Sequence, residues 1–500
     1  MLLNKLLSTV EVINEVGDLN LDITNIHSDS RKIENGGLFF AINGFSKDGT
    51  EFIPDALKNG AIAVIVEKDV DVESINTQYR VPVIAVKNTR KALAEVSCEF
   101  YDNPSKKLKL IGVTGTKGKT TSTFMIKSML QAHGLKVGLI GSIAFYINDE
   151  KIEGTDRTTP ESMDIQKYLA KMVEEKCDVA IIETSSQAMK LDRVTGCDFD
   201  VSLFTNLSED HISPKEHPNM EDYFNCKLEL LKISKHAVIN NDDEKVCTIK
   251  SLLPEKDIRT FSIEKESNFK VNESSLIITD SYIDFEINYN GKQEKVEASI
   301  PGRFSVYNAA GSIAVASYFD VTAEEIRSAL KDLKVLGRSE LVPNKLGLTI
   351  MIDYAHTPSS LESILTAVRS YAKGRVICAW GVGGDRDAAK RPVMGEISGR
   401  LADYTVLMSD QVRTEDPLKI LKEIEVGIIP THKPYKIVVD RTEGIRYAIS
   451  IANPGDIIVI PGLGHDLYLE RNGVKYPYNE REVIAKIIDE MIASGERKPV

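Results

Sequence analysis

The sequence lacks the features of a secreted, disulfide-bonded or membrane-spanning chain. Its six cysteines are scattered and include no Cys-x-x-Cys pair, which excludes a zinc ribbon and a disulfide framework and indicates a reducing cytoplasm. No apolar run approaches the roughly 20 residues of a membrane-spanning helix. The first 20 residues mix apolar with acidic side chains and lack a small-residue cleavage site. We therefore expect a helix there, not a signal peptide, and a cytoplasmic protein without membrane insertion.

An excess of positive charge is also missing. The 62 basic and 74 acidic side chains give a net charge of −12. This balance excludes a general binder of nucleic acids or anionic membranes. Any polyanionic ligand must therefore meet positive groups that are gathered locally.

The length of the chain predicts several domains, because 500 residues exceed one ordinary domain. Apolar runs alternate with amphipathic runs throughout, which predicts α/β architecture. Residues 1–103 should form a small α/β domain with strands at 38–42, 61–66 and 82–86, and Asn103-Pro104-Ser105 is a plausible linker.

Residues 104–337 should form a central domain with a doubly wound parallel sheet, because the apolar runs are separated by helical segments long enough for crossovers. Its strands are expected at 108–113, 137–140, 179–183, 201–206 and 237–240. Residues 258–300 predict an antiparallel β insertion, followed by a helix over 304–318. Residues 338–500 should form a third domain, with a second, Rossmann-like parallel sheet whose strands lie at 348–353, 375–380, 404–408, 435–439 and 457–460.

A glycine-rich turn stands between the first central strand and the helical run that follows it. Residues 112–122 read GVTGTKGKTTS, a variant of the phosphate-loop pattern that has Val113 where the strict pattern has glycine. Backbone amides of such a turn cradle phosphates. Lys119 would reach the outer phosphates of ATP and Thr120 would hold Mg²⁺. The loop residues expected to contact the nucleotide are Gly115, Thr116, Lys117, Gly118, Lys119, Thr120 and Thr121. The alternative is an ordinary glycine-rich turn.

Polar clusters follow other strands, where the carboxyl ends of a parallel sheet place ligands. Glu183 is a natural second Mg²⁺ ligand, and His211 is a candidate metal ligand that Asp210 could orient. The serines at 185 and 186 could equally cap a helix. In the third domain, loops at 353–358, 381–387, 408–413 and 461–466 carry Asp, Arg, His and Gly, and they predict a small-molecule site.

These motifs resemble the Mur ligase family, which adds amino acids to UDP-N-acetylmuramoyl peptides, and they are most similar to the member that adds the third peptide residue. The resemblance spans nearly the whole chain. It rests on the segments HSDSRKIENGGLFFAING (27–44), GVTGTKGKTTS (112–122), TTPES (158–162), ETSSQA (183–188), FTNLSEDH (204–211), GRFSVYN (302–308), LGRSE (336–340), DYAHTP (353–358), GGDRDAAKRP (383–392) and GVKYPYNEREV (473–483).

The resemblance implies an ATP-dependent, Mg²⁺-requiring ligase that acts through an acyl phosphate, and we expect a monomer. Ser28, Asp29, Ser30 and Arg31 would contact the uridine end of the substrate, and Thr158, Thr159, Ser185 and Arg193 its muramoyl-peptide part. Asn308 and Arg338 would face the nucleotide, and Asp353 its ribose. Lys227 matches the lysine that the family carbamylates to bridge a second Mg²⁺, although an ordinary helix lysine is the alternative. Arg386 would bind the carboxylate of the incoming amino acid, and Asp410, Arg413, Gly462 and Asp466 would be further contacts of this substrate, with Arg413 and Asp466 at its distal end.

Two loops depart from the family pattern. Family members that use meso-diaminopimelate carry Asp-Asn-Pro-Arg where this chain has Asp410-Gln411-Val412-Arg413. A later Gly-Lys-Gly-His-Glu is here Gly462-Leu463-Gly464-His465-Asp466. Arg413 favours a diaminopimelate-like substrate, whereas residues 211–224 look more like lysine-adding relatives. The residues thus predict a diamino acid and leave lysine and meso-diaminopimelate open.

Several other functions compete with this one. A ligase of a specialised or pseudomurein-type wall is one alternative. A folylpolyglutamate synthase is another, and the uridine-like motif and the loops at 353–358 and 383–387 argue against it. An inactive nucleotide-binding paralogue is the third, and the intact Lys119, Thr120, Glu183 and His211 argue against that.

Overall fold

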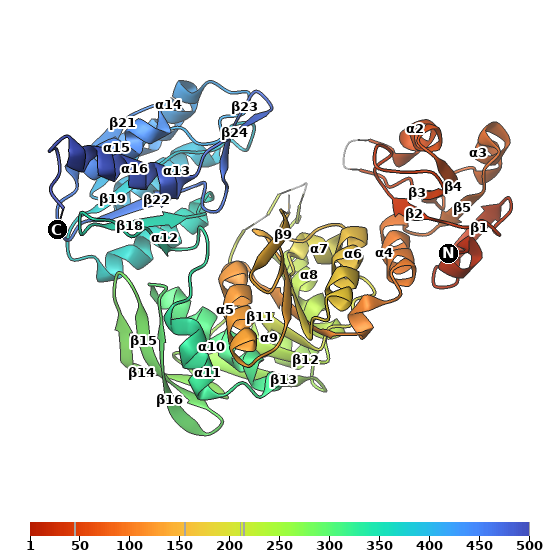
Figure 1. Ribbon diagram of the computed structural model, residues 1–500, viewed down its shortest axis with the longest axis horizontal. Coiled ribbons are helices and arrows are strands. Elements are labelled where there is room, and N and C mark those ends of the chain that lie inside the picture. Colours follow the sequence, from red (N-terminus) through yellow and green to blue (C-terminus); the bar gives the residue numbers. More distant parts are fainter. Residues whose placement is uncertain (45–46, 155–156, 211, 214–215, 500) are drawn as a thin grey trace. The chain divides into compact units, whose positions relative to one another are not determined.

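The computed structural model describes residues 1–44, 47–154, 157–210, 212–213 and 216–499 (Figure 1). The chain forms two compact units. Unit 1 comprises residues 1–269 and 311–322, and unit 2 comprises residues 270–310 and 323–500. No helix in the described ranges is long and apolar enough to cross a membrane.

Unit 1 begins with a mostly parallel sheet in the strand order β1-β5-β4-β3-β2, in which β1 alone runs antiparallel to its neighbour β5. Its strands are mainly buried, as those of a parallel sheet with both faces covered should be. The elements in chain order are α1 (Leu3–Leu7), β1 (Val12–Val16), β2 (Asn25–His27), β3 (Gly37–Phe40), a 3₁₀ turn (Gly49–Phe52), α2 (Ile53–Lys58), β4 (Ala61–Glu67), α3 (Val72–Tyr79), β5 (Val83–Val86), α4 (Thr89–Phe100) and a second 3₁₀ turn (Pro104–Lys106).

The expected N-terminal helix over residues 1–20 is wrong beyond its first turn. Helix α1 ends at Leu7, and residues 12–16 form strand β1 instead. The segment VINEV contains two β-branched valines and an isoleucine, and it pairs with β5 along the sheet edge. Tertiary pairing therefore overrides the apolar spacing that suggested a helix.

The second part of unit 1 is a mostly parallel sheet with β6 near its centre, in the order β13-β12-β11-β6-β10-β7-β8-β9. Because β6 lies between β10 and β11, the chain winds to both sides of it, as the doubly wound prediction requires. The elements are β6 (Lys109–Thr114), α5 (Lys119–Ala132), β7 (Val137–Ile140), β8 (Ala144–Ile147), β9 (Glu150–Gly154), α6 (Ser162–Glu174), β10 (Val179–Glu183), α7 (Ser186–Lys190), β11 (Val201–Phe204), α8 (Met220–Ile233), β12 (His236–Asn240), α9 (Val246–Leu252) and β13 (Asp257–Ser262).

Two details of this sheet differ from expectation. The predicted antiparallel insertion begins too early, because β13 pairs parallel with β12 and extends the main sheet. The strands β8 and β9 form an antiparallel edge that the sequence did not predict. All five residues of β9 are exposed, so this strand has no alternation of apolar and polar residues that could mark it in the sequence.

Unit 2 contains an antiparallel meander and a second α/β sheet (Figure 1). The meander is formed by β14 (Phe269–Ile278), β15 (Ile283–Tyr289) and β16 (Lys292–Ala298). Helix α10 (Arg303–Ala316) contributes residues to both units, and a 3₁₀ turn (Ser317–Phe319) and α11 (Ala323–Lys331) follow it.

The second sheet has the order β17-β18-β22-β19-β20-β21 and is parallel except for β17. Its central strands β19 and β22 are buried along their whole length, which agrees with the predicted Rossmann-like domain. The elements are β17 (Glu340–Leu341), β18 (Thr349–Asp353), α12 (Pro358–Tyr371), β19 (Val376–Trp380), α13 (Lys390–Leu401), β20 (Tyr404–Leu407), α14 (Pro417–Ile428), a 3₁₀ turn (Ile429–Thr431), β21 (Tyr435–Ile437), α15 (Arg441–Ile451), β22 (Ile457–Pro461), β23 (Tyr468–Arg471), β24 (Val474–Pro477) and α16 (Glu480–Ala493).

Candidate active site

The glycine-rich turn connects β6 to α5 at the centre of the unit 1 sheet. Gly115 has φ of 148°, and a Cβ added there would lie 1.9 Å from Thr205 Oγ1. Gly118, with φ of 83°, is the N-cap residue of α5. Both positions therefore require glycine, one for lack of space and both for the backbone conformation. The turn leads directly into the N-terminus of α5, where backbone amides and the helix dipole favour the binding of anions.

Side chains of the segment that follows β11 hold the turn in shape. Asn206 accepts a hydrogen bond from the amide of Lys117 (3.0 Å) and donates one to its carbonyl oxygen (3.0 Å). Thr205 Oγ1 donates to the same carbonyl at 2.6 Å. Lys119 Nζ donates to the carbonyl oxygens of Gly115 and Thr116, at 3.0 Å each. The predicted loop residues are thus assembled into one ordered turn with an ammonium group folded onto it.

Thr120 and Glu183 form a hydroxyl–carboxylate pair at the first turn of α5. Thr120 Oγ1 donates to Glu183 Oε1 at 3.0 Å, and the other carboxylate oxygen accepts a bond from the amide of Ser142 at 3.0 Å. Both side chains are buried, and so is that of Thr121. Hard oxygen ligands of this kind are what Mg²⁺ binds beside phosphates. The fourth predicted metal residue, His211, lies outside the described residues.

Lys227 reaches the same turn from helix α8. It is 1% exposed, and its Nζ donates to the carbonyl oxygen of Gly115 at 2.8 Å. The ammonium also lies 4.3 Å from the ring centroid of Tyr223, whose hydroxyl donates to Thr116 Oγ1 at 3.2 Å. Burial, reinforced by the nearby Lys119, holds the pKa of Lys227 well below its usual value. The neutral amine, which is the nucleophilic form, is therefore easier to reach here than at an exposed lysine.

The residues predicted to grip the muramoyl-peptide part lie together beside Glu183. Thr159 Oγ1 donates to the carbonyl oxygen of Glu183 at 2.7 Å and accepts a bond from the amide of Ser185 at 3.0 Å. Arg193 donates to the carbonyl of Thr159 at 3.1 Å. The hydroxyl of Thr158 accepts from Ser142 Oγ at 3.0 Å. Ser185 also caps helix α7, so the helix-cap alternative describes part of its role.

A charged pocket of about 430 Å³ in unit 1 contains part of the predicted uridine motif. Ser28 and Asp29 line it, together with basic side chains that include Arg90 and Arg157. The hydrogen bond from Arg31 lowers the pKa of Asp29 to about 2, so this carboxyl is ionised at neutral pH. Ser30 is buried, and its carbonyl oxygen accepts a bond from Asn59.

In unit 2, Asp353 stands at the carboxyl end of β18. It accepts hydrogen bonds from the amides of Ser339 (2.8 Å) and Ala355 (2.9 Å). Burial raises its pKa more than the neighbouring Arg338 lowers it. The Arg338 guanidinium lies 5.0 Å from the ring centroid of Tyr354. The remaining nucleotide residue predicted here, Asn308, is buried on α10.

The loops after β18, β22, β19 and β20 lie on neighbouring strands, as the predicted small-molecule site requires. Gly462 has φ of 124°, and a Cβ there would lie 2.3 Å from Asp410 Oδ2. Asp410 lies 3.6 Å from the buried Arg441, which donates to Glu480 at 2.8 Å. The glycine therefore lets the loop after β22 approach a fixed carboxylate.

Asp466 and Arg413 bring opposite charges to the same group of loops. Gln411 Nε2 donates to Asp466 Oδ2 at 2.7 Å. Burial, with the nearby Asp410 as the next cause, raises the pKa of Asp466 to about 6. Arg413 donates to the carbonyl of Gly384 at 2.6 Å. Arg386 lies exposed in the loop 383–387. Carboxylates and guanidinium groups so arranged suit a ligand with both amino and carboxyl groups.

Sequence reasoning missed three residues that complete these sites. Ser142 and Tyr223 have no motif around them that points to a role, because their contacts depend on distant chain segments. Gln411 belongs to the segment 410–413, which differs from the family pattern, so the sequence did indicate that this position matters. Its hydrogen bond to Asp466, 55 positions away, could not be predicted from the sequence.

The fold and the turn at residues 115–118 define an α/β enzyme that binds nucleotide phosphates. Family models match the chain as "Mur ligase family, catalytic domain" over residues 22–101, "Mur ligase middle domain" over 113–316 and "Mur ligase, glutamate ligase domain" over 337–464. The chain belongs to the Mur ligase family, and it is accordingly an ATP-dependent, ADP-forming amide ligase.

Individual relatives narrow this assignment. A UDP-N-acetylmuramoyl-L-alanyl-D-glutamate–2,6-diaminopimelate ligase of Clostridium acetobutylicum is 42% identical over 500 residues, covering 98% of this chain and all of that protein. The ligase of the same name from Clostridium tetani is 42% identical over 494 residues, with 98% and 100% covered. A solved structure of a ligase with this name has a TM-score of 0.69 at 26% identity, and covers 98% of this chain and 99% of its own. The expected similarity to MurE, the member that adds the third residue, is confirmed.

Proposed function

We propose that this protein joins 2,6-diaminopimelate to UDP-N-acetylmuramoyl-L-alanyl-D-glutamate in peptidoglycan precursor synthesis, with cleavage of ATP to ADP and phosphate. The Thr120–Glu183 pair beside Lys119 carries the proposal, because a hydroxyl and a carboxylate next to a lysine suit Mg²⁺ and phosphates, and the chain matches such ligases over nearly its full length. Lysine and diaminopimelate were both open from the sequence. The relatives' names and the cationic Arg413, which suits a distal carboxylate, favour diaminopimelate.

Thr120 and Glu183 are the residues that would hold Mg²⁺, with His211 expected as a further ligand. When bound, the metal would neutralise part of the negative charge on the ATP phosphates. The backbone amides of the turn and Lys119 bind the ATP phosphates and stabilise charge on the transferring group. The γ-phosphoryl group passes to the free carboxylate of the UDP-linked dipeptide and gives an acyl phosphate. An amine of the diamino acid then attacks the acyl carbon, and inorganic phosphate leaves as the amide forms.

Lys227 is positioned to take the carbamate that the family places on this lysine. Its lowered pKa supports that role, because only a neutral amine attacks CO₂. The resulting anion would lie beside Lys119 and the turn, where it would serve as a further metal ligand.

The remaining assignments are also proposals. We assign the UDP-linked end of the substrate to residues 1–103, ATP cleavage to 104–337 and the amino acid to 338–500. Ser28, Ser30, Thr158, Thr159, Ser185 and Arg193 contact the UDP-linked dipeptide; Asn308, Arg338 and Asp353 contact the nucleotide; and Arg386, Asp410, Arg413, Gly462 and Asp466 contact the diamino acid. The protein acts as a cytoplasmic monomer, and its six free cysteines support a reducing compartment.

Amino-acid-dependent ADP release tests the reaction. The UDP-dipeptide, ATP and Mg²⁺ are incubated with 2,6-diaminopimelate, lysine, ornithine or alanine, and the nucleotide-linked product is identified by mass. We expect diaminopimelate to give the highest kcat/KM. Lys119→Ala should abolish turnover and preserve binding of the UDP-dipeptide, whereas Lys107→Ala, at an exposed lysine, should leave turnover near the wild-type rate. Release with lysine alone would refute the choice of diamino acid, and release with none of the four would refute the ligase reaction.

Arg413→Ala tests the recognition of the distal carboxylate. We expect it to lower kcat/KM for diaminopimelate by at least about tenfold more than for lysine, because a charge-assisted bond contributes about 1.5–3 kcal/mol. Arg471→Ala, at an exposed arginine on β23, is the matched control. Equal losses with both amino acids would remove this role from Arg413.

A further inference from the structure

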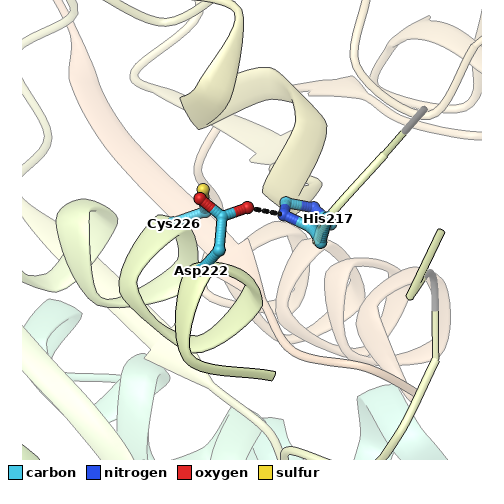
Figure 2. A group of neighbouring side chains, drawn as sticks. All are labelled: His217, Asp222 and Cys226. Atoms are coloured by element: carbon cyan, nitrogen blue, oxygen red, sulfur yellow. Dashed lines mark hydrogen bonds and ion pairs between the residues drawn. The ribbon is translucent and has the colours of Figure 1, made fainter. Parts of the chain in front are cut away.

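Three side chains with metal-binding atoms meet near the start of helix α8, and none of them has a role in the reaction described above. They are His217, Asp222 and Cys226 (Figure 2). A ring nitrogen of His217, a carboxylate oxygen of Asp222 and Cys226 Sγ all lie within 4.8 Å of one another. Asp222 and Cys226 are four positions apart on α8, so they project from the same side of the helix. His217 comes from the segment that precedes the helix.

We propose that this cluster binds a divalent transition metal of the Zn²⁺ or Co²⁺ class. Thiolate, imidazole and carboxylate are the ligands that zinc takes, and three protein ligands with a water complete its tetrahedron. Mg²⁺ prefers oxygen ligands alone, so this site is chemically distinct from the one at Thr120 and Glu183. Zinc bonds of about 2.0–2.3 Å separate neighbouring ligands by about 3.5 Å. The three ligand atoms, which lie within 4.8 Å of one another, are already close to that spacing.

The histidine already has the support that metal-bound histidines use. His217 is fully buried, and its Nε2 lies 2.9 Å from Ser186 Oγ at the first position of α7. Its Nδ1 faces Asp222 Oδ2 at 2.7 Å. Anchoring of the second ring nitrogen fixes the orientation and the tautomer of a metal-bound imidazole. The ring is therefore held with Nδ1 toward Asp222.

The carboxylate of Asp222 already binds one cationic group, the ammonium of Lys190. Lys190 Nζ donates to Asp222 Oδ2 and to the carbonyl oxygen of Glu216, at 2.8 Å each. The Lys190 side chain is 34% exposed, so its ammonium can leave for solvent when a metal enters. The metal and Lys190 therefore compete for Asp222. Removal of Lys190 should therefore change metal affinity only if Asp222 binds a metal. In a cluster that merely connects the loop to the helix, there would be no such effect.

A metal here would fasten the segment before α8 to the first two turns of that helix. The same helix carries Tyr223 and Lys227, which contact the phosphate-binding turn. The proposal goes beyond the ligase reaction and does not depend on which amino acid is added.

Titration of the reduced, chelator-treated full-length protein with Co²⁺ alone tests the site. We expect one Co²⁺ per chain, a thiolate-to-cobalt charge-transfer absorption, and retention of this absorption in excess Mg²⁺. Cys226→Ser should remove the absorption and weaken binding by at least about tenfold. Cys247→Ser, at an exposed cysteine on α9, is the matched control and should change neither. Lys190→Met should tighten binding severalfold, because it removes the competing ammonium.

Three results would overturn the proposal: a wild-type protein without the charge-transfer absorption, a Cys226→Ser variant that retains it, or a Lys190→Met variant with unchanged affinity. Thermal melts of each variant establish that it is folded. If Cys226→Ser does not fold, the wild-type titration and Lys190→Met decide the question, since Lys190 lies at the surface of the cluster and its methylene stem is preserved.

Discussion

Replacement of Arg391 by methionine should destabilise unit 2 by about 3 kcal/mol. The guanidinium of Arg391 is 1% exposed, and it donates to both oxygens of Glu415 (2.9 and 2.7 Å) and to Glu423 (2.6 Å). Breaking a buried ion pair from one side costs about 3–5 kcal/mol, because the partner charges lose their compensation. We take the lower end of that range, since both carboxylates retain some contact with water. The expected fall in the melting temperature is about 6–12 °C.

The same helix supplies a matched control. Arg400 also pairs with two glutamates, Glu362 and Glu396, but it is 45% exposed. Arg400→Met should therefore cost no more than about 1 kcal/mol. Urea unfolding followed by circular dichroism measures both variants. Equal losses would show that burial of the Arg391 network contributes nothing, and the argument would be wrong.

The pH dependence gives a second check on the Arg391 network. The hydrogen bond from Arg391 lowers the pKa of Glu415 to about 2. A carboxyl whose pKa is lowered by folding stabilises the protein above its ordinary pKa, near 4.5, and loses that contribution as the pH falls toward 2. The difference in unfolding free energy between wild type and Arg391→Met should therefore shrink over this range. A constant difference would contradict the assigned cause.

Other perturbations test the candidate sites. Gly115→Ala should abolish ATP turnover, because its Cβ would meet Thr205, whereas Gly134→Ala, also at positive φ but with open space around it, should cost only about 1 kcal/mol of stability in a melt. If Asp466 binds the distal ammonium, the KM for the diamino acid should rise as pH falls through about 6, and Asp466→Asn should abolish that dependence; an unchanged pH profile in the variant would contradict it. Lys227→Met should lose turnover with little loss of stability, since burial already disfavours the charged form of this amine. A large drop in melting temperature would show that the amine is structural.

Much of the fold could be predicted from local sequence. The strands at 137–140 and 179–183 begin and end as predicted, because continuous apolar runs bounded by polar residues mark buried parallel strands. Segments whose state depends on a partner were mispredicted. Strand β1 forms because β5 offers it an edge, and β13 runs parallel because it continues the main sheet. Neither fact is encoded in the residues of the strand itself.

The candidate site divides in the same way. Lys119 and Thr120 could be predicted as candidates, because phosphate binding requires consecutive residues with a fixed spacing. The Gln411–Asp466 contact and the Ser142 amide that binds Glu183 join residues far apart in the chain. The spacing of residues along the chain does not indicate these long-range contacts, so they are seen only in the folded structure.

The loops that follow β19 and β20 are fastened to each other, and this affects how substrate choice can change. Asp385 accepts bonds from the amide and hydroxyl of Thr414, and its own amide donates to Glu415, which Arg391 holds from α13. A change in one loop therefore disturbs the other. An engineer who wants to move amino-acid selectivity from one relative to another should therefore exchange both loops together with Arg391. Grafting residues 410–413 from a relative with a different amino acid into this chain, without its matching 383–391 segment, should give a folded but poorly selective enzyme.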